Sequence, residues 1–188
     1  MAKELDVSFR TMLTLSEYNK LIDEFKGSNA NYQTNYYFDT KRFSLKAAEI
    51  VLRVKERDKM ELGLKRKKGY TLVNINEPIT KEQFQDLLNN SVIPFKSIFN
   101  EIAEIVKDQK LINYLSLSTY RVFLPYKHGL LAIDKVEYLG QTDYELEFQA
   151  SNRESGKREF VETVKELGIQ YKKGETKLKR AYNALKRI

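Results

Sequence analysis

The segment Ile50–Arg57 carries basic residues at alternate positions, Arg53, Lys55 and Arg57. Alternate side chains of a β-strand share one face and lie roughly 7 Å apart. This spacing suits the successive groups of a phosphate chain, whose oxygens accept charge-assisted hydrogen bonds from arginine and lysine. The segment therefore predicts a strand with a phosphate-binding face.

Carboxylates alternate in the same way in a later segment, where Tyr144–Phe148 contains Glu145 and Glu147. Asp6, near the start of the chain, adds a third acidic group. Oxygen ligands of this kind suit a hard cation, and magnesium needs only one or two carboxylates together with substrate phosphates. We therefore predict a site for Mg²⁺ or Mn²⁺.

Two environments could hold these charges. One face of an antiparallel sheet is often solvated, and charges on such a face need no further explanation. The charges here are sorted by segment and by sign, and the opposite faces are apolar enough to be buried. This sorting favours a closed barrel, with Lys65 and Arg121 as further inward cations.

The elements that position these residues are mainly strands, so we predict an α+β fold rich in antiparallel strands. The strands are expected at 5–10, 35–40, 50–57, 60–65, 70–76, 115–125, 130–138 and 143–149. One helix is expected after the capping-box pair Thr14 and Glu17, ending at Gly27, and another where Thr80 and Gln83 begin a helical stretch. Further helices are expected at 97–107, 157–167 and 175–186.

Length and composition limit the class of protein. A chain of 188 residues with 41% hydrophobic residues can bury one core, so a single domain over residues 1–188 is expected. The net charge of +7 favours a polyanionic partner. The chain has no cysteine, no apolar leader and no stretch apolar enough to span a bilayer, so we expect a cytoplasmic protein without membrane contact.

Several segments, in this order, resemble the CYTH superfamily, or triphosphate tunnel metalloenzymes, and most closely its small bacterial single-domain branch. The matching segments are Tyr36-Tyr37-Phe38-Asp39-Thr40, Leu52-Arg53-Val54-Lys55, Leu62-Gly63-Leu64-Lys65, Leu131-Ala132-Ile133-Asp134 and Tyr144-Glu145-Leu146-Glu147. The resemblance implies a closed eight-stranded antiparallel β-barrel whose lumen binds triphosphate. Members hydrolyse inorganic triphosphate, thiamine triphosphate or RNA ends, or cyclise ATP.

Carried over by position, the resemblance implies roles for individual residues. The implied phosphate-binding residues are Arg10, Arg53, Lys55, Lys65 and Arg121, with Lys177 and Arg180 from the C-terminal helix. Glu145, Glu147 and Asp6 are the implied metal ligands and catalytic carboxylates, and Asp134, the acidic residue of the preceding strand, is a further implied metal ligand. Asp134 could equally be a structural salt-bridge partner, and Lys177, judged without the family, could be a solvated helix residue.

The chain departs from the family pattern at its first strand. Relatives usually carry glutamate, glutamate and lysine at alternate positions, where this chain has Asp6, Ser8 and Arg10. Asn74 stands where an inward glutamate is expected. Serine and asparagine bring no charge, so we expect weaker metal binding.

The predicted function is hydrolysis of a triphosphate or similar polyphosphate with a divalent metal, by attack of water on the terminal phosphorus. One alternative is a polyphosphate or nucleotide binding module that has lost turnover. Adenylate cyclase or thiamine triphosphatase activity is less favoured. A nucleic-acid binder is suggested by the net charge and by the basic tail near Tyr171 and Tyr182, although no nucleic-acid motif accompanies them.

Overall fold

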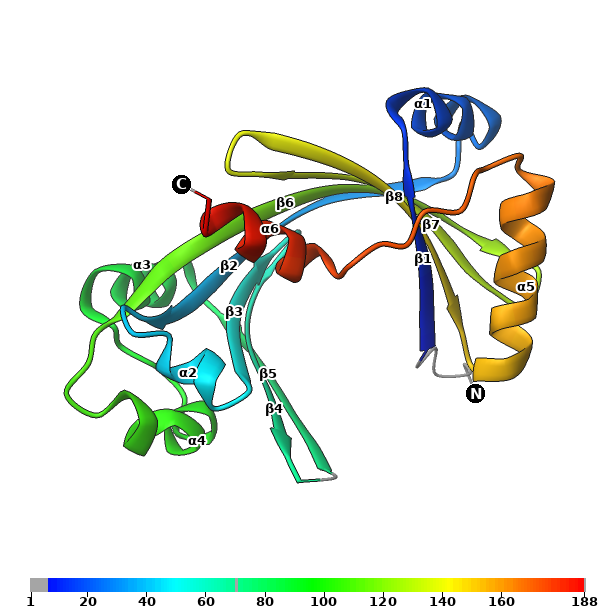
Figure 1. The fold of residues 1–188 in the computed structure, drawn as a ribbon. Helices are drawn as coiled ribbons and strands as arrows, with labels where there is room; N and C mark the ends of the chain where they lie inside the picture. Colours follow the sequence, from blue (N-terminus) through cyan, green and yellow to red (C-terminus); the bar gives the residue numbers. More distant parts are fainter. Residues whose placement is uncertain (1–6, 70, 188) are drawn as a thin grey trace. The chain divides into compact units, whose positions relative to one another are not determined.

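The computed structural model describes residues 7–69 and 71–187. It contains both strands and helices (Figure 1). The strands are β1 Val7–Leu13, β2 Asn29–Thr40, β3 Ile50–Glu56, β4 Met60–Lys68, β5 Thr71–Ile79, β6 Leu111–Tyr126, β7 Gly129–Tyr138 and β8 Gln141–Ala150. The helices are α1 Leu15–Glu24, α2 Ser44–Ala47, α3 Lys81–Asn90, α4 Lys96–Val106, α5 Arg153–Glu166 and α6 Lys177–Leu185. The predicted strand Leu5–Arg10 begins outside the described residues.

The eight strands form one sheet in the order β1-β8-β7-β6-β2-β3-β4-β5. The predicted α+β fold of eight antiparallel strands with flanking helices is therefore confirmed. Closure of the barrel is not confirmed. Strands β1 and β5 stand at the two ends of this order, and they do not pair with each other among the described residues. Part of the outer edge of β1 is already occupied, since the amide of Met12 donates to the carbonyl oxygen of Lys172 at 3.0 Å.

The chain divides into two compact units. The terminal unit comprises the residues up to Tyr32 and those from Ser118 onward, and the central unit comprises Gln33–Leu117. Strands β2 and β6 contribute residues to both units. Each unit has its own hydrophobic core, so each can be described by itself.

In the central unit, strands β3 and β4 separate apolar and charged side chains onto opposite faces. Leu52, Val54, Leu62 and Leu64 are buried in its core. Helices α3 and α4 cover that core with Phe84, Leu87, Ile98 and Ile102, which confirms the two helices predicted after Thr80 and at 97–107. The basic side chains of β3 are consequently on the face away from these helices.

In the terminal unit, α1 and α5 pack on the apolar side of β1, β7 and β8. The predicted capping box begins α1, because the side chains and amides of Thr14 and Glu17 bond each other reciprocally. Glu17 also accepts hydrogen bonds from the amide of Gln170 and from the ammonium of Lys172. Helix α1 thus fastens the segment that leads to α6.

Element boundaries differ from the sequence prediction in a few places. Strand β2 begins at Asn29 rather than Asn35, although Asn29, Ala30 and Asn31 have little strand propensity. Helix α5 begins at Arg153, where the side chain of Asn152 caps two amides. The short helix α2 was not expected. No helix among the described residues is long and apolar enough to cross a membrane.

Candidate metal and phosphate site

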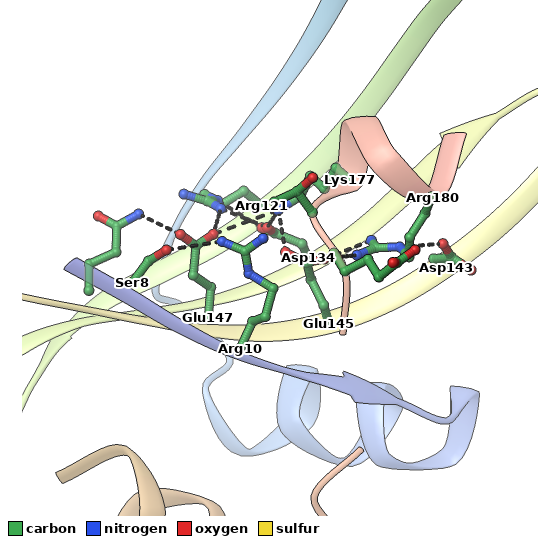
Figure 2. Close-up of polar contacts among 12 residues, drawn as sticks. Ser8, Arg10, Arg121, Asp134, Asp143, Glu145, Glu147, Lys177 and Arg180 are labelled. Carbon is green, nitrogen blue, oxygen red and sulfur yellow. Dashed lines mark hydrogen bonds and ion pairs between the residues drawn. The ribbon is translucent and has the colours of Figure 1, made fainter. Parts of the chain in front are cut away.

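Three carboxylates meet in the terminal unit on the face of the sheet away from α1 and α5 (Figure 2). Asp134, Glu145 and Glu147, the carboxylate trio, each offer an oxygen within 4.8 Å of the others. All three are buried, Asp134 and Glu145 completely. Burial of ionised carboxylates is costly unless each is paired, so their partners decide what the group can do.

Strand register explains why these residues meet. Arg121 of β6 lies opposite Asp134 of β7, and Asp134 lies opposite Glu145 of β8. Two residues further along β8, Glu147 lies opposite Arg10 of β1. Side chains that are directly opposite and on one face are neighbours, so four strands bring their charges to one place.

Arg121 joins two members of the trio. Its Nε and Nη2 donate to both oxygens of Asp134 at 2.8 and 2.7 Å, and Nη2 also donates to Glu147 Oε2 at 2.6 Å. Burial lowers the pKa of Arg121, but the two carboxylates outweigh burial and raise it overall. Arg121 therefore remains charged and ties the trio to β6.

Lys177, the first residue of α6, reaches all three carboxylates. Its Nζ lies 2.8 Å from Asp134 Oδ2, in contact with Glu145 Oε1, and 3.7 Å from Glu147 Oε2. The side chain of Thr176 caps α6 and fixes where the helix begins. Burial lowers the pKa of Lys177, whereas the trio raises it by more, so the ammonium stays protonated.

Arg180, one turn further along α6, completes the group. Its Nη2 lies 2.7 Å from Glu145 Oε2, and its Nε donates to Asp143 Oδ2 at 2.8 Å. Asp143 also accepts a hydrogen bond from the hydroxyl of Tyr138, whose pKa is raised to about 12 by burial and by this bond. Sequence reasoning missed Asp143, although it alternates with Glu145 and Glu147 and could have been found from that period.

Glu147 is held in its charged form. Burial raises its pKa, but the charges of Arg121 and Lys177 and hydrogen bonds from Arg121 and Gln149 lower it to about 2. The carboxylate is therefore an anion throughout the neutral range and can act as an oxygen ligand without losing a proton.

The first strand contributes less than the family pattern suggests. Arg10 donates from Nη2 to the hydroxyl of Ser8 at 3.0 Å and forms no ion pair with a described residue. Its donors thus remain available beside Glu147 (Figure 2). Asp6, the third predicted acidic ligand, lies outside the described residues.

The predicted phosphate-binding residues Arg53, Lys55 and Lys65 belong to the central unit and share the face of β3 and β4 opposite its core. Burial, Arg53 and Lys55 together lower the pKa of Lys65. Lys55 pairs with Glu61 at 3.1 Å. Arg57 lies past the end of β3 and pairs with Asp58 at 3.5 Å, so it does not extend this row.

The structure therefore brings together Arg121, Asp134, Glu145, Glu147, Lys177 and Arg180, all within the terminal unit. Asp134 and Lys177 are ion-paired at the centre of this group. In this group, carboxylate oxygens that can ligate a metal lie beside guanidinium and ammonium groups that can donate hydrogen bonds. Such an arrangement suits a hard cation and phosphate oxygens bound side by side. That this group and the basic face of β3 and β4 line one tunnel stays a prediction.

Comparison with known proteins gives matches over nearly the whole chain. A family model described as "CYTH domain" matches residues 5–182. A Bacillus subtilis (strain 168) protein described as "Putative triphosphatase YjbK" is 28% identical over 186 residues, covering 97% of this chain and 96% of that protein.

Solved structures agree with this match. A Bacillus halodurans protein described as a "putative adenylate cyclase" is 27% identical, with a TM-score of 0.79 over 96% of this chain and 98% of its own. A Hippeastrum protein described as a "putative adenylyl cyclase" with a dominant triphosphatase activity is 21% identical. Its TM-score is 0.77, over 94% of this chain and 95% of its own, and at this identity it shows the fold alone.

Proposed function

The chain belongs to the CYTH family, and on that premise we propose that it binds the phosphate groups of a triphosphate and hydrolyses the terminal phosphoanhydride bond with Mg²⁺ or Mn²⁺. The observation that carries the proposal is the buried carboxylate trio with Arg121, Lys177 and Arg180 around it. Each buried ion costs several kcal/mol to desolvate, and together with the family match this favours ligand binding over a purely structural network.

The residues present fit a hard divalent cation. Asp134, Glu145 and Glu147 supply only oxygen donors, and these lie close enough to share one ion. They are the residues that would hold the metal. When bound, a divalent metal would offset charge on the phosphoryl oxygens and lower the barrier to attack by water.

The protein's own cations supply the rest of the binding. Arg121 and Arg180 already donate to carboxylates through Nε and Nη2, so either could bind a phosphate group only by sharing these donors or by exchanging a carboxylate for phosphate. Arg10, whose guanidinium has no carboxylate partner among the described residues, can donate to phosphate without breaking an ion pair. Glu147, charged at neutral pH, is positioned to accept a hydrogen bond from the attacking water.

Inorganic triphosphate is the simplest substrate that this site fits, because its residues are charged side chains that can bind phosphate oxygens or a cation. The alternative function is a polyphosphate-binding module without turnover. The reason to consider it is that Ser8 and Asn74 carry no charge. This alternative predicts the same binding and no release of phosphate.

Purified protein incubated with tripolyphosphate and either Mg²⁺ or Mn²⁺ tests the proposal by release of orthophosphate. Glu147→Ala should lower the rate by roughly 100-fold, because it removes a metal ligand and one of the two carboxylate partners of Arg121. Glu137→Ala, which removes an exposed glutamate from the same sheet, should leave the rate unchanged.

Circular dichroism should show that the Glu147→Ala chain is folded, and Glu147→Gln, which keeps the side-chain volume, is the second variant. Tight binding of tripolyphosphate by wild-type protein without release of orthophosphate would establish the binding module instead. Absence of both binding and release would overturn the proposal.

A further inference from the structure

A second basic pocket lies in the central unit, formed by the loop after β2 and the loop after α4. It is lined by Lys41, Arg42 and the segment Lys107–Lys110, and its volume is about 520 Å³. This loop pocket shares no lining residue with the carboxylate trio or with the basic face of β3 and β4. Its volume falls within the usual range of small-ligand sites.

The loop pocket has an excess of positive charge. Lys41, Arg42, Lys107 and Lys110 face one acidic residue, Asp108, and none of the four cations forms an ion pair with a described residue. Other basic residues of the unit do have such partners, as in the pairs Arg66–Glu101 and Lys55–Glu61. Cations gathered in a concave place without carboxylates raise the local concentration of anions.

Buried and partly buried hydrogen bonds hold the first loop in place and join it to the second. Asp39 accepts from the amides of Thr40, Leu45 and Lys46, which fixes the turn that carries Lys41 and Arg42. Ser44 then donates to Gln109 Oε1 at 3.0 Å. Gln109 in turn donates to the carbonyl oxygen of Ile105 at 3.1 Å, within α4.

This fastening matters because the backbone that carries the four cations is ordered before any ligand arrives. A ligand then bears less of the entropy cost of ordering its site. The backbone of the pocket is therefore held in place, and its four cationic side chains are exposed to an incoming ligand.

We propose that the loop pocket is a second anion site, which binds a compact multivalent phosphate such as pyrophosphate or tripolyphosphate. Four cations in so small a volume match an anion that concentrates several charges on a few atoms. The lining contains no aromatic side chain on which a base could stack, which favours inorganic phosphates over single-stranded nucleic acid.

Calorimetric titration with tripolyphosphate, in the absence of metal, tests the site. Wild-type protein should show one more equivalent of bound anion than the variant Lys107→Ala/Lys110→Ala, or an affinity about 10-fold higher for that equivalent. Lys41→Ala/Arg42→Ala, on the opposite loop, should have the same effect. Release of orthophosphate should be unchanged in both variants.

The matched control is Lys81→Ala/Lys96→Ala, which removes two exposed charges from α3 and α4 of the same unit but outside the pocket. It should bind like wild-type protein. An equal loss of binding in this control would show that net charge alone explains the effect, which would refute the proposal. Unchanged binding in both pocket variants would also refute it. Binding of an RNA oligonucleotide that pyrophosphate does not displace would make the pocket a nucleic-acid contact and refute the proposal.

This outcome is separable from that of the proposed function. Suppose that the wild-type protein releases no orthophosphate, but the pocket variants bind one equivalent of anion fewer. That result would support the second anion site and refute the proposed hydrolysis.

Discussion

Lys177 lies among the oxygens that a metal ion would use. Its ammonium contacts Asp134 and Glu145 and approaches Glu147, so it neutralises part of the trio's charge from inside. A dication that binds the trio must therefore displace this side chain or share oxygens with it, and either event weakens binding.

Replacing Lys177 by methionine should strengthen the binding of Mn²⁺ to the protein. The variant removes both the competing cation and its repulsion, and a gain of about 1.4 kcal/mol would appear as a 10-fold lower dissociation constant. Calorimetric titration of Mn²⁺ without phosphate is the measurement. Lys179→Met, which removes an exposed lysine of α6 that pairs with Glu175, is the control.

An unchanged or lower affinity for Mn²⁺ in Lys177→Met would contradict this account. It would mean that the ion pairs of Lys177 stabilise the trio's geometry more than they compete with metal.

The charged residues of the site were predictable individually, but their pairings were not. Alternation along β8 identified Glu145 and Glu147, and the family likeness identified Arg121 and Lys177. Which carboxylate meets which cation depends on strand register and on where α6 begins, and tertiary contacts set both. Asp143 shares the alternation of Glu145 and Glu147, but only the fold shows that its partner is Arg180.

Among the elements, α2 shows how a short helix can depend on one buried side chain. Asp39 is almost fully buried and accepts three backbone amides, including those of Leu45 and Lys46 within the helix. A helix of four residues has too few internal hydrogen bonds to be stable alone. The carboxylate therefore supplies what the helix lacks.

Asp39→Ala should lower the free energy of unfolding by about 3 kcal/mol or more, since buried amides would lose a charged acceptor. Urea denaturation followed by circular dichroism measures the change. Asp58→Ala, which removes an acidic side chain that is 88% exposed at a turn, should change stability by less than about 0.5 kcal/mol. Equal stability of the two variants would show that Asp39 does not hold α2.

Sequence patterns located most elements because apolar residues recur with a clear period, as in β3 and α4. They failed where no such period exists. The start of β2 is polar, and α2 is too short to show helical periodicity, so only their tertiary partners define them. Barrel closure also could not be read from local signals, because it concerns the partner of an edge strand.

At the scale of the whole molecule, buried ion pairs connect stability to pH. The folded pKa of Glu147 is about 2, below its ordinary value of 4.5. Between pH 4.5 and pH 2, the unfolded chain therefore binds more protons at Glu147 than the folded chain does. The contribution of Glu147 to the free energy of unfolding is complete above pH 4.5 and is lost as the pH falls toward 2. Its size is at most roughly 3 kcal/mol.

Glu147→Gln should therefore have a flatter dependence of unfolding free energy on pH between 4.5 and 2.5 than wild-type protein. Urea midpoints measured across that range provide the test. A residual slope is expected, because hydrogen bonds from Thr14 and Lys172 overcome the effect of burial and lower the pKa of Glu17 to about 2 as well. Glu137→Gln should retain the full slope, and a variant slope equal to that of wild type would contradict the assignment.

The trio and Asp143 carry four negative charges and Arg10, Arg121, Lys177 and Arg180 carry four positive ones, so the formal charges of this group cancel. A dication arriving alone would leave this balanced group with surplus positive charge, and a triphosphate arriving alone would leave it surplus negative. Each ligand offsets the imbalance that the other creates. Metal and triphosphate should therefore bind with positive cooperativity, each raising the affinity for the other by the same factor.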